Sequence, residues 1–261
     1  MHRFFIAPEL LAHPQARLVL PEKMAHQLRD VLHLEVGEHL ALLDNSGEEV
    51  LCEITKSHRA GVEVQVLERR AGKRESPVRI ILCQGLLKSA RFEWILEKGT
   101  ELGVATFVPM LCRRSMAGLE DAGASKIQRW QRIVQEAAEQ CGRARLPELL
   151  PICPLQHVLS NIPVGVQALM PWEEEHEKSL HEALKIIVAS HQQSAPSSIT
   201  VALLIGPEGG LMAEEVRLAQ RHNVQAVTLG TRILRAETAA LTAVANVMYE
   251  LEAQRLPEQL T

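Results

Sequence analysis

Aromatic residues are scarce and make up only 3% of the 261 residues. A binding surface built mainly from stacked Phe, Tyr and Trp side chains is therefore not expected. No C-x-x-C pair occurs among the five cysteines, and the eleven histidines show no H-E-x-x-H spacing. These absences argue against a zinc cluster or another metal site, and five scattered cysteines fit a reducing cytoplasm.

Long apolar runs are also absent. No apolar stretch reaches the ~18 residues that a membrane-spanning helix needs, and the apolar run in the N-terminal MHRFFIAPELLAHP is too short for a signal peptide. Hydrophobic residues nevertheless make up 46% of the chain, which excludes a mainly disordered protein. We expect a cytoplasmic protein without a membrane span, folded as one large domain or two smaller ones.

An excess of basic residues is missing, since the formal net charge is -4. A generic nucleic-acid binder, whose affinity comes from a basic surface, is thus disfavoured. Residues 1–73 contain 9 Lys and Arg against 11 Asp and Glu, residues 74–147 contain 12 against 8, and residues 148–261 contain 7 against 13. The positive middle third indicates a local anionic partner, although a solvated charged face would show the same pattern.

The first 70 residues are predicted to be mostly strands. GEHLALLD, EEVLCEIT and GVEVQVLE alternate apolar and polar residues, and a DNSGE turn joins the first two. PEKMAHQLRDVLHL has helical spacing. Together these segments predict a small β-barrel or compact sheet. The polar AGKRESP at 71–77 indicates a boundary between a domain at 1–72 and a domain at 73–261.

Beyond this boundary, short Val/Ile/Leu runs alternate with helical stretches. Such alternation is typical of an α/β fold with a parallel sheet covered on both faces. The expected strands are 78–84, 104–109, 148–152, 166–170, 199–205 and 224–229, and the expected helices are 90–102, 124–141, 177–189, 212–222 and 236–254. Ligands bind at the carboxyl ends of strands in such sheets, so the loops at 170–175, 206–211 and 230–235 are the candidates for a site.

The stretch LLIGPEGGLMAEEV at 203–216 places a glycine-rich turn between an expected strand and an expected helix. It matches neither the GxxxxGK[ST] nor the GxGxxG phosphate motif. Gly206, Gly209 and Gly210 would let a ligand approach the backbone, whereas Glu208 would repel a phosphate. The turn predicts a ligand with little phosphate charge, and a helix-capping turn without a ligand is the alternative.

A second glycine turn, LGTRILRAETAALTAV at 229–244, follows the last expected strand. Ile233 and Leu234 are apolar where turns usually carry polar residues, which indicates the wall of a pocket. Arg235 alone would be interpreted as a surface cation, and Glu237 as a favourable charge in the first turn of a helix. Beside a second glycine turn at the same sheet edge, both become candidate catalytic residues.

IGPEGGL together with LGTRILRAETA, near the C-terminus, resembles the SPOUT class of methyltransferases. Within this class the chain is similar to the RsmE family, which methylates N3 of a uridine in 16S ribosomal RNA. FEWILEKGTELGV at 92–104, RRS at 113–115 and EAAEQCGR at 136–143 agree, as does a β-rich N-terminal part, where the family carries a PUA-like RNA-binding domain. Two segments depart from the pattern: Ala90 replaces an acidic residue, and LMPWEEE at 169–175 lacks the basic residues of some relatives.

The resemblance implies a SPOUT α/β-knot domain with a deep trefoil knot, S-adenosylmethionine as methyl donor, and a homodimer. Carried over residue by residue, the cofactor site would comprise Leu169, Met170, Pro171, Gly206, Pro207, Glu208, Gly209, Gly210, Leu229, Gly230, Ile233 and Leu234. S-adenosylmethionine has no phosphate, which agrees with the acidic residue in the first turn.

Methylation of uracil N3 requires the loss of a weakly acidic proton, and a cation would stabilise the developing anion. Arg235 is predicted to supply this charge, with Glu237 or water as the proton acceptor. The predicted partner is 16S rRNA in the small ribosomal subunit, held through its phosphates. The candidate phosphate contacts are Arg3, Lys88, Arg91, Arg113, Arg114, Arg143 and Arg145.

Three other functions stay open at the level of sequence. A SPOUT enzyme could act on a ribose 2′-hydroxyl, on another RNA position or on transfer RNA. A non-catalytic RNA-binding assembly protein could keep the same fold. An α/β enzyme that handles phosphate is disfavoured by Glu208 and by the missing lysine.

Overall fold

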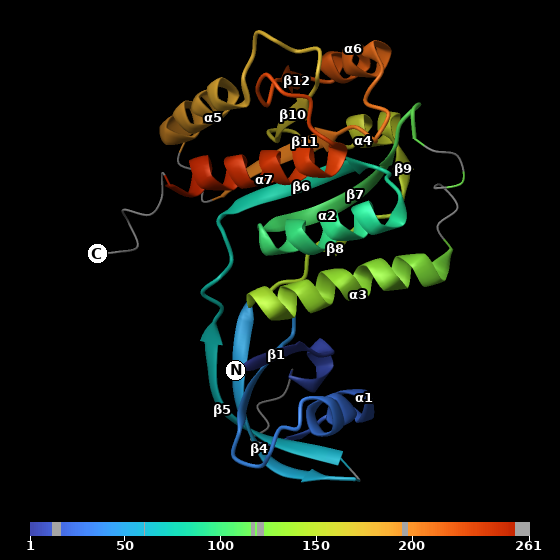
Figure 1. Ribbon diagram of the computed structural model, residues 1–261. Coiled ribbons are helices and arrows are strands. Elements are labelled where there is room, and N and C mark those ends of the chain that lie inside the picture. Colours follow the sequence, from blue (N-terminus) through green and yellow to red (C-terminus); the bar gives the residue numbers. More distant parts are fainter. Residues whose placement is uncertain (12–16, 60, 116–117, 119–122, 195–197, 254–261) are drawn as a thin grey trace. The chain divides into compact units, whose positions relative to one another are not determined.

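The computed structural model describes residues 1–11, 17–59, 61–115, 118, 123–194 and 198–253. It divides into two compact units (Figure 1). The first unit contains Met1–Glu75 and Ala138–Leu146, and the second contains Ser76–Ala137 and the chain from Pro147 onward. The sequence did not indicate that residues 138–146 pack with the N-terminal strands. The functional boundary between residues 72 and 73 stays a prediction.

A five-stranded mixed sheet forms the first unit, in the order β1-β3-β4-β5-β2. Its strands are β1 (His2–Phe5), β2 (Arg17–Val19), β3 (His39–Leu43), β4 (Glu48–His58) and β5 (Gly61–Ala71). β1 and β3 are parallel, and the other neighbours are antiparallel. In the predicted turn between β3 and β4, Asn45 and Gly47 have φ angles of 67° and 96°, as a tight turn requires.

Helical turns cover one side of this sheet. They are a 3-10 turn (Pro8–Leu10), helix α1 (Glu22–His26) and the π-helical turn that continues it (Gln27–Val31). Ala25 and Leu28 pack in one buried cluster with Leu40, Ile54 and Val64 of the sheet. The sequence predicted either a small β-barrel or a compact sheet. The described strands form a sheet, with β1 and β2 at opposite ends of the strand order.

Residues Ala138–Leu146 are held in the first unit by both apolar and polar contacts. The buried apolar cluster comprises Phe5, Leu43, Ala138 and Ala144. The Glu75 carboxylate accepts hydrogen bonds from Arg143 Nη2 at 3.1 Å and from the backbone N–H groups of Ala144 and Arg145, both at 3.0 Å. A carboxylate that satisfies three donors ties this distant segment to the end of the N-terminal chain.

The second unit is built on a seven-stranded sheet in the order β12-β10-β11-β6-β7-β8, with β9 beside β7. Its strands are β6 (Val78–Gly85), β7 (Val104–Leu111), β8 (Glu148–Leu149), β9 (Cys153–Pro154), β10 (Gln167–Pro171), β11 (Ile199–Ile205) and β12 (Val224–Val227). All the pairings are parallel, as predicted. The segment 148–152 was predicted as one strand, but β8 ends at Leu149 and the next strand, β9, begins only at Cys153. Pro151, which has no N–H to donate to a neighbour, lies between them.

Helices cover both faces of this parallel sheet (Figure 1). They are α2 (Ser89–Glu101), α3 (Ala124–Cys141), α4 (Leu155–Ser160), α5 (Leu180–Ser194), α6 (Ala213–Arg221) and α7 (Ala236–Ala253). The side chains of β11 alternate between the faces: Leu203 joins the core under α2, α3, α5 and α7, whereas Leu204 joins the core under α4 and α6. This explains the continuous apolar run of the strand. The short α4 was not predicted, because six residues carry too little periodicity.

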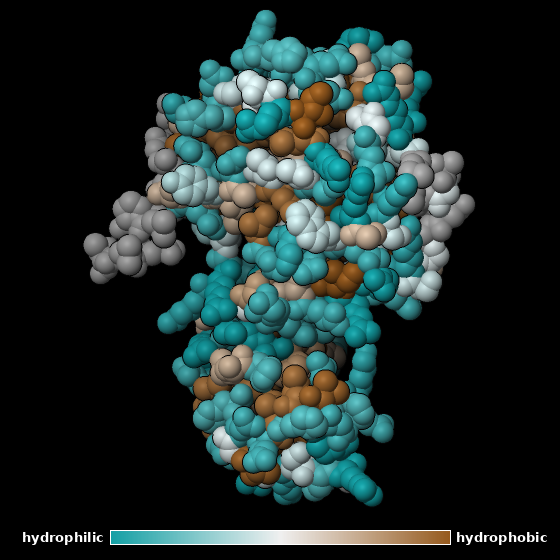
Figure 2. All heavy atoms as spheres, viewed as in Figure 1, coloured by the Kyte–Doolittle hydropathy of each residue, from teal (hydrophilic) through white to brown (hydrophobic). Residues whose placement is uncertain are grey.

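The described helices include none that is long and apolar enough to cross a membrane. The face in Figure 2 is largely hydrophilic, with apolar side chains in small groups. Large apolar side chains that stay exposed include Ile233 at 87%, Tyr249 at 76% and Ile186 at 66%. Isolated exposed apolar residues are ordinary, so only those beside a cavity need a functional explanation.

Candidate functional site

Three loops meet at one edge of the parallel sheet, where β12, β10 and β11 lie side by side. They follow the carboxyl ends of these strands at residues 228–235, 172–179 and 206–212. The Trp172 N–H donates to the Val227 carbonyl at 3.0 Å, and Ser179 forms an isolated bridge with Thr228. The first two loops are thus joined through their backbones, at the place where ligands bind in open α/β sheets.

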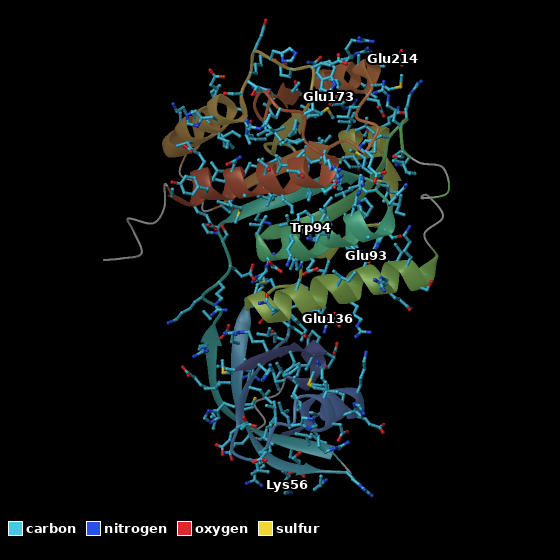
Figure 3. The ribbon with its side chains drawn as sticks, viewed as in Figure 1. Lys56, Glu93, Trp94, Glu136, Glu173 and Glu214 are labelled. Carbon is cyan, nitrogen blue, oxygen red and sulfur yellow. The ribbon has the colours of Figure 1, made fainter. Side chains whose placement is uncertain are left out.

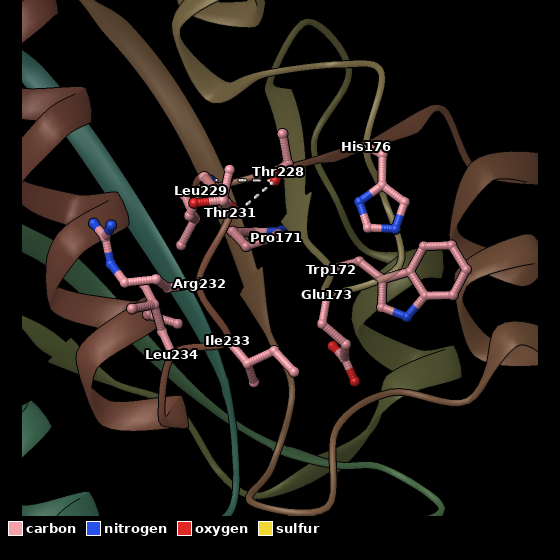
Figure 4. A pocket seen from close by; sticks show the side chains of 12 residues that line it. Pro171, Trp172, Glu173, His176, Thr228, Leu229, Thr231, Arg232, Ile233 and Leu234 are labelled. Atoms are coloured by element: carbon pink, nitrogen blue, oxygen red, sulfur yellow. Dashed lines mark hydrogen bonds between the residues drawn. The ribbon is translucent and has the colours of Figure 1, made fainter.

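A cavity of about 300 Å³ opens between the loop after β10, the loop after β12 and the start of α7 (Figure 4). Its lining residues are Pro171, Trp172, Glu173, His176, Thr228, Leu229, Gly230, Thr231, Arg232, Ile233, Leu234 and Ala239. The predicted cofactor residues Pro171, Leu229, Gly230, Ile233 and Leu234 therefore meet in one cavity. Leu169 and Met170 belong to β10 and do not line the cavity, since they are 2% and 0% exposed in the core.

The sequence did not single out the polar part of this lining. Trp172, Glu173 and His176 come from the loop after β10, and Thr231 and Arg232 come from the loop after β12. Both loops were predicted to belong to a ligand site because they follow expected strands of the parallel sheet. The position after a buried strand was therefore the only feature of the sequence that pointed to these residues. No motif pointed to the individual side chains.

The glycine turn at Gly206–Gly210 lies beside this cavity. Gly210 has a φ of 72°, and its N–H donates to the Pro207 carbonyl at 2.9 Å. A Cβ atom on Gly210 would lie 2.5 Å from Glu173 Oε1, and one on Gly209 would lie 3.0 Å from the Arg114 Cβ. Arg114 Nη1 also donates to the Gly209 carbonyl at 3.0 Å. The two glycines therefore leave room for neighbouring side chains to approach the turn closely.

The end of β6 supports the glycine turn. Gln84 is buried, and its Nε2 donates to the Gly85 carbonyl at 2.9 Å and to the Gly206 carbonyl at 3.3 Å. A Cβ atom on Gly85 would lie 2.5 Å from the Pro207 nitrogen and 2.7 Å from the Gly206 carbonyl carbon. The turn can pack this closely on β6 only because residue 85 has no side chain.

Arg91 of α2 connects the glycine turn to the start of α7. Its Nη1 lies 2.9 Å from Glu208 Oε1, and its Nε lies 3.7 Å from Glu237 Oε1. From the sequence, Glu208 was expected to be an unpaired negative charge in the turn. In the structure it forms an ion pair with Arg91. The guanidinium of Arg91, which was predicted as a phosphate contact, pairs with two carboxylates that lie 117 and 146 positions along the chain.

The two candidate catalytic residues differ in their surroundings. The Glu237 side chain, in the first turn of α7, is 13% exposed, and its Oε2 is buried without a hydrogen-bond partner in the described part of the chain. A buried acceptor without a partner costs free energy, which marks a position for a donor from a ligand or water. Arg235 is exposed, and the described residues include no hydrogen-bond or ion-pair partner for its side chain. Its guanidinium is available to a bound anion.

The other candidate cations of the second unit follow β6 and β7. Lys88 and Arg113 are exposed. The backbone N–H of Arg113 donates to Glu215 Oε1 at 2.8 Å, and that of Met212 donates to Glu215 Oε2 at 2.9 Å. This buried carboxylate positions the loop after β7 beside the start of α6, so Arg113 and Arg114 lie at the same sheet edge as the glycine turn.

The candidate cations of the first unit are mostly paired. Arg3 is 14% exposed with its Nε 3.4 Å from Glu49 Oε1, and Arg143 is 9% exposed in its pair with Glu75. Either side chain would have to leave a carboxylate to bind a phosphate. Arg145 is exposed, although its Nη1 donates to the Asn45 carbonyl at 3.4 Å.

Replacing Arg91 with alanine is expected to raise amide hydrogen exchange at Gly209 and Gly210 about two- to fivefold. The Arg91–Glu208 pair is partly exposed, so its loss should ease local opening of the turn by less than about 1 kcal/mol. Exchange measured by mass spectrometry tests this, with Arg132→Ala as the matched control, because that change removes an exposed pair with Glu136 on α3. Unchanged exchange in Arg91→Ala would contradict the proposed connection.

Among the side chains that the structure describes, no group of three or more His, Cys, Asp and Glu is arranged to hold a metal ion. The thiol of Cys112, next to the loop that carries Arg113, is buried, and this burial raises its pKa to about 12. Cys112 is therefore protonated at neutral pH and unsuited to act as a nucleophile.

Comparison with known proteins supports the predicted family. A family model described as an RNA methyltransferase domain matches residues 74–248. The chain is 32% identical over 231 residues to the ribosomal RNA small subunit methyltransferase E of Bacillus subtilis, covering 88% of this chain and 89% of that protein. It is 34% identical over 252 residues to the protein of that name from Synechocystis, covering 96% of this chain and 78% of the relative.

The fold also matches a solved structure. The crystal structure of a ribosomal RNA small subunit methyltransferase E from Neisseria gonorrhoeae, bound to S-adenosyl methionine, has a TM-score of 0.81 and 29% sequence identity with this chain. The match covers 95% of this chain and 97% of that chain, so the predicted fold class is confirmed. The chain belongs to the ribosomal RNA small subunit methyltransferase E family of RNA methyltransferases.

Proposed function

We propose that this chain transfers a methyl group from S-adenosylmethionine to N3 of a uridine in 16S rRNA of the small ribosomal subunit. The cavity at the sheet edge carries the proposal. Leu229 to Leu234 of the loop after β12 line this cavity, Arg235 is the last residue of the same loop, and Glu237 lies in the first turn of α7. The names of the relatives specify small-subunit ribosomal RNA. The choice of uridine N3 rests on the resemblance of IGPEGGL and LGTRILRAETA to the RsmE family.

The cavity fits a cofactor without phosphate groups. Pro171, Leu229, Ile233 and Leu234 provide an apolar wall, and Gly230 offers its backbone groups. A volume of about 300 Å³ lies at the lower end of the range for small-molecule sites. When bound, S-adenosylmethionine supplies a methyl group that its sulfonium already activates. The glycine turn at Gly206–Gly210 would complete the site beside Glu173.

Arg235 and Glu237 have complementary roles in this proposal. The Glu237 Oε2 atom, which lacks a partner among the described residues, accepts the N3 proton of the target uracil. Arg235 provides positive charge beside the anion that this step creates. Arg91 holds the other carboxylate oxygen of Glu237 and so orients the acceptor.

Phosphate contacts are proposed from exposed cations at the same edge of the sheet, namely Lys88, Arg113 and Arg114. Arg113 Nη1 lies 3.7 Å from Glu214 Oε2, but both side chains are largely exposed, so this pair is easily exchanged for a phosphate. Arg145 is the strongest candidate of the first unit, whereas Arg3 and Arg143 are mostly buried with their carboxylate partners and Arg91 is engaged by Glu208 and Glu237. The N-terminal domain at 1–72 is proposed to bind RNA in the manner of a PUA-like domain, and the domain at 73–261 to carry out the methylation.

The paired substitution Arg113→Ala and Arg114→Ala is expected to make the salt dependence of RNA binding less steep. Each lost phosphate contact lowers the slope of log K against log salt by about 0.9, so the pair should lower it by about 2. Binding to small subunits measured across a salt series tests this. An Arg217→Ala and Arg221→Ala variant on α6 is the control, and an equal slope in both variants would remove the pair from the interface.

A homodimer is proposed from the family resemblance. Exposed Tyr249 on α7 supports it, because this side chain lines a cavity of about 440 Å³ together with Leu180 and Leu184. Light scattering of the purified protein tests this state directly. A cytoplasmic location is proposed from the ribosomal substrate.

One experiment decides the substrate. The purified protein and labelled S-adenosylmethionine are incubated with small subunits that lack the modification, and the modified base is mapped by nucleoside mass spectrometry. We expect 3-methyluridine at a single position of 16S rRNA. A ribose 2′-O-methyl product would place the enzyme in another branch of the SPOUT class. The absence of cofactor binding would instead support a non-catalytic assembly protein.

A further inference from the structure

Glu173 is the one acidic residue among the described residues that line the 300 Å³ cavity. It follows β10 by two positions and lies on the upper part of the second unit in Figure 3. In Figure 4 the Glu173 carboxylate lies to the right of Ile233, and Arg232 lies on the left of the view. A ligand in this cavity would therefore meet negative charge on one side.

The carboxylate of Glu173 has no hydrogen-bond or ion-pair partner in the described part of the chain. Its neighbour Glu175 is used differently, because it accepts the N–H groups of Glu177 at 2.8 Å and of Lys178 at 3.1 Å. These backbone donors hold the pKa of Glu175 below its usual range. Glu175 thus stabilises the loop, whereas Glu173 keeps both oxygens available for a ligand.

The glycine turn brings backbone close to this carboxylate. Glu173 Oε1 lies 2.5 Å from the position that a Cβ on Gly210 would occupy, and Arg114 Nη1 lies 3.8 Å from the same position. Arg114 makes its hydrogen bond with the Gly209 carbonyl rather than with Glu173. Glu173 therefore stands where the cavity meets the glycine turn, with its charge not neutralised by a direct ion pair.

We propose that Glu173 binds the ammonium group of the amino-acid portion of S-adenosylmethionine and sets the preference of the cavity for ligands that carry this group. The proposal rests on the cofactor proposed above. An ammonium group has three N–H donors and suits a carboxylate with free oxygens, whereas a sulfonium offers charge but no N–H donor. The adenine portion would then lie against the apolar wall formed by Leu229, Ile233 and Leu234.

Calorimetric titration with three ligands tests this assignment. S-adenosylmethionine carries ammonium and sulfonium, S-adenosylhomocysteine carries only the ammonium, and 5′-methylthioadenosine carries neither. Glu173→Gln is expected to weaken the binding of the first two ligands about tenfold, which corresponds to about 1.4 kcal/mol. The affinity for the third ligand should change less than twofold. Glu174→Gln, at an exposed neighbour outside the cavity lining, is the matched control and should bind all three like the wild type.

Several results would overturn the assignment. Equal affinity of Glu173→Gln and wild type for S-adenosylmethionine would remove Glu173 from the site. A loss for S-adenosylmethionine alone would place it beside the sulfonium, and an equal loss for all three ligands would show a structural role. If the wild type bound none of the ligands, the proposed cofactor would fail and this inference with it, which the titration distinguishes from a failure of Glu173 alone.

Discussion

Replacing Arg235 with alanine is expected to lower the rate of rRNA methylation by about 10²- to 10³-fold, with S-adenosylmethionine affinity within about twofold of wild type. Arg235 is exposed and without a side-chain partner among the described residues, so its loss should not disturb the fold. In the proposed mechanism its charge acts on the uracil anion that forms during the reaction, and such a contribution appears in the chemical step. Single-turnover methylation of unmodified small subunits measures the rate, and calorimetry measures cofactor binding.

Two further variants make this result specific. Arg235→Lys keeps a positive charge and should recover part of the rate, while Arg217→Ala, an exposed arginine of α6, should leave the rate unchanged. A wild-type rate in Arg235→Ala would exclude the electrostatic role. A parallel loss of cofactor binding would instead assign Arg235 to the cofactor rather than to the uracil.

Replacing Gly85 with alanine is expected to weaken S-adenosylmethionine binding by about tenfold or more and to destabilise the fold by about 1–3 kcal/mol. The added Cβ would lie 2.5 Å from the Pro207 nitrogen and 2.7 Å from the Gly206 carbonyl carbon. These are backbone atoms of the glycine turn, which cannot rotate away as a side chain could. The turn must therefore shift from its position beside the cavity.

Gly165→Ala is the control for Gly85→Ala. Gly165 has a φ of 88°, so alanine there is strained by about 1–2 kcal/mol, but no heavy atom lies within 4 Å of the added Cβ. This variant should lose stability in chemical denaturation and keep its cofactor affinity. If Gly85→Ala bound the cofactor like wild type, the glycine turn would have no part in the site.

Periodicity explains how much of the second unit was predictable. The run ITVALLI is apolar on both sides because Leu203 and Leu204 enter different cores, and this pattern correctly predicted a strand of a parallel sheet. The helix predicted at 124–141 coincides with α3. The motifs IGPEGGL and LGTRILRAETA indicated the family, which the comparisons show.

The sequence by itself determined the longer helices and strands, the family and the loops that follow β10, β11 and β12, because local periodicity and contiguous motifs are written along the chain. Only the tertiary structure decided which charges meet. It placed Arg91 between Glu208 and Glu237, buried Arg143 against Glu75, and left Glu173 open in the cavity. These contacts join side chains tens to more than a hundred positions apart, and such distances are set by packing rather than by any pattern in the neighbouring residues.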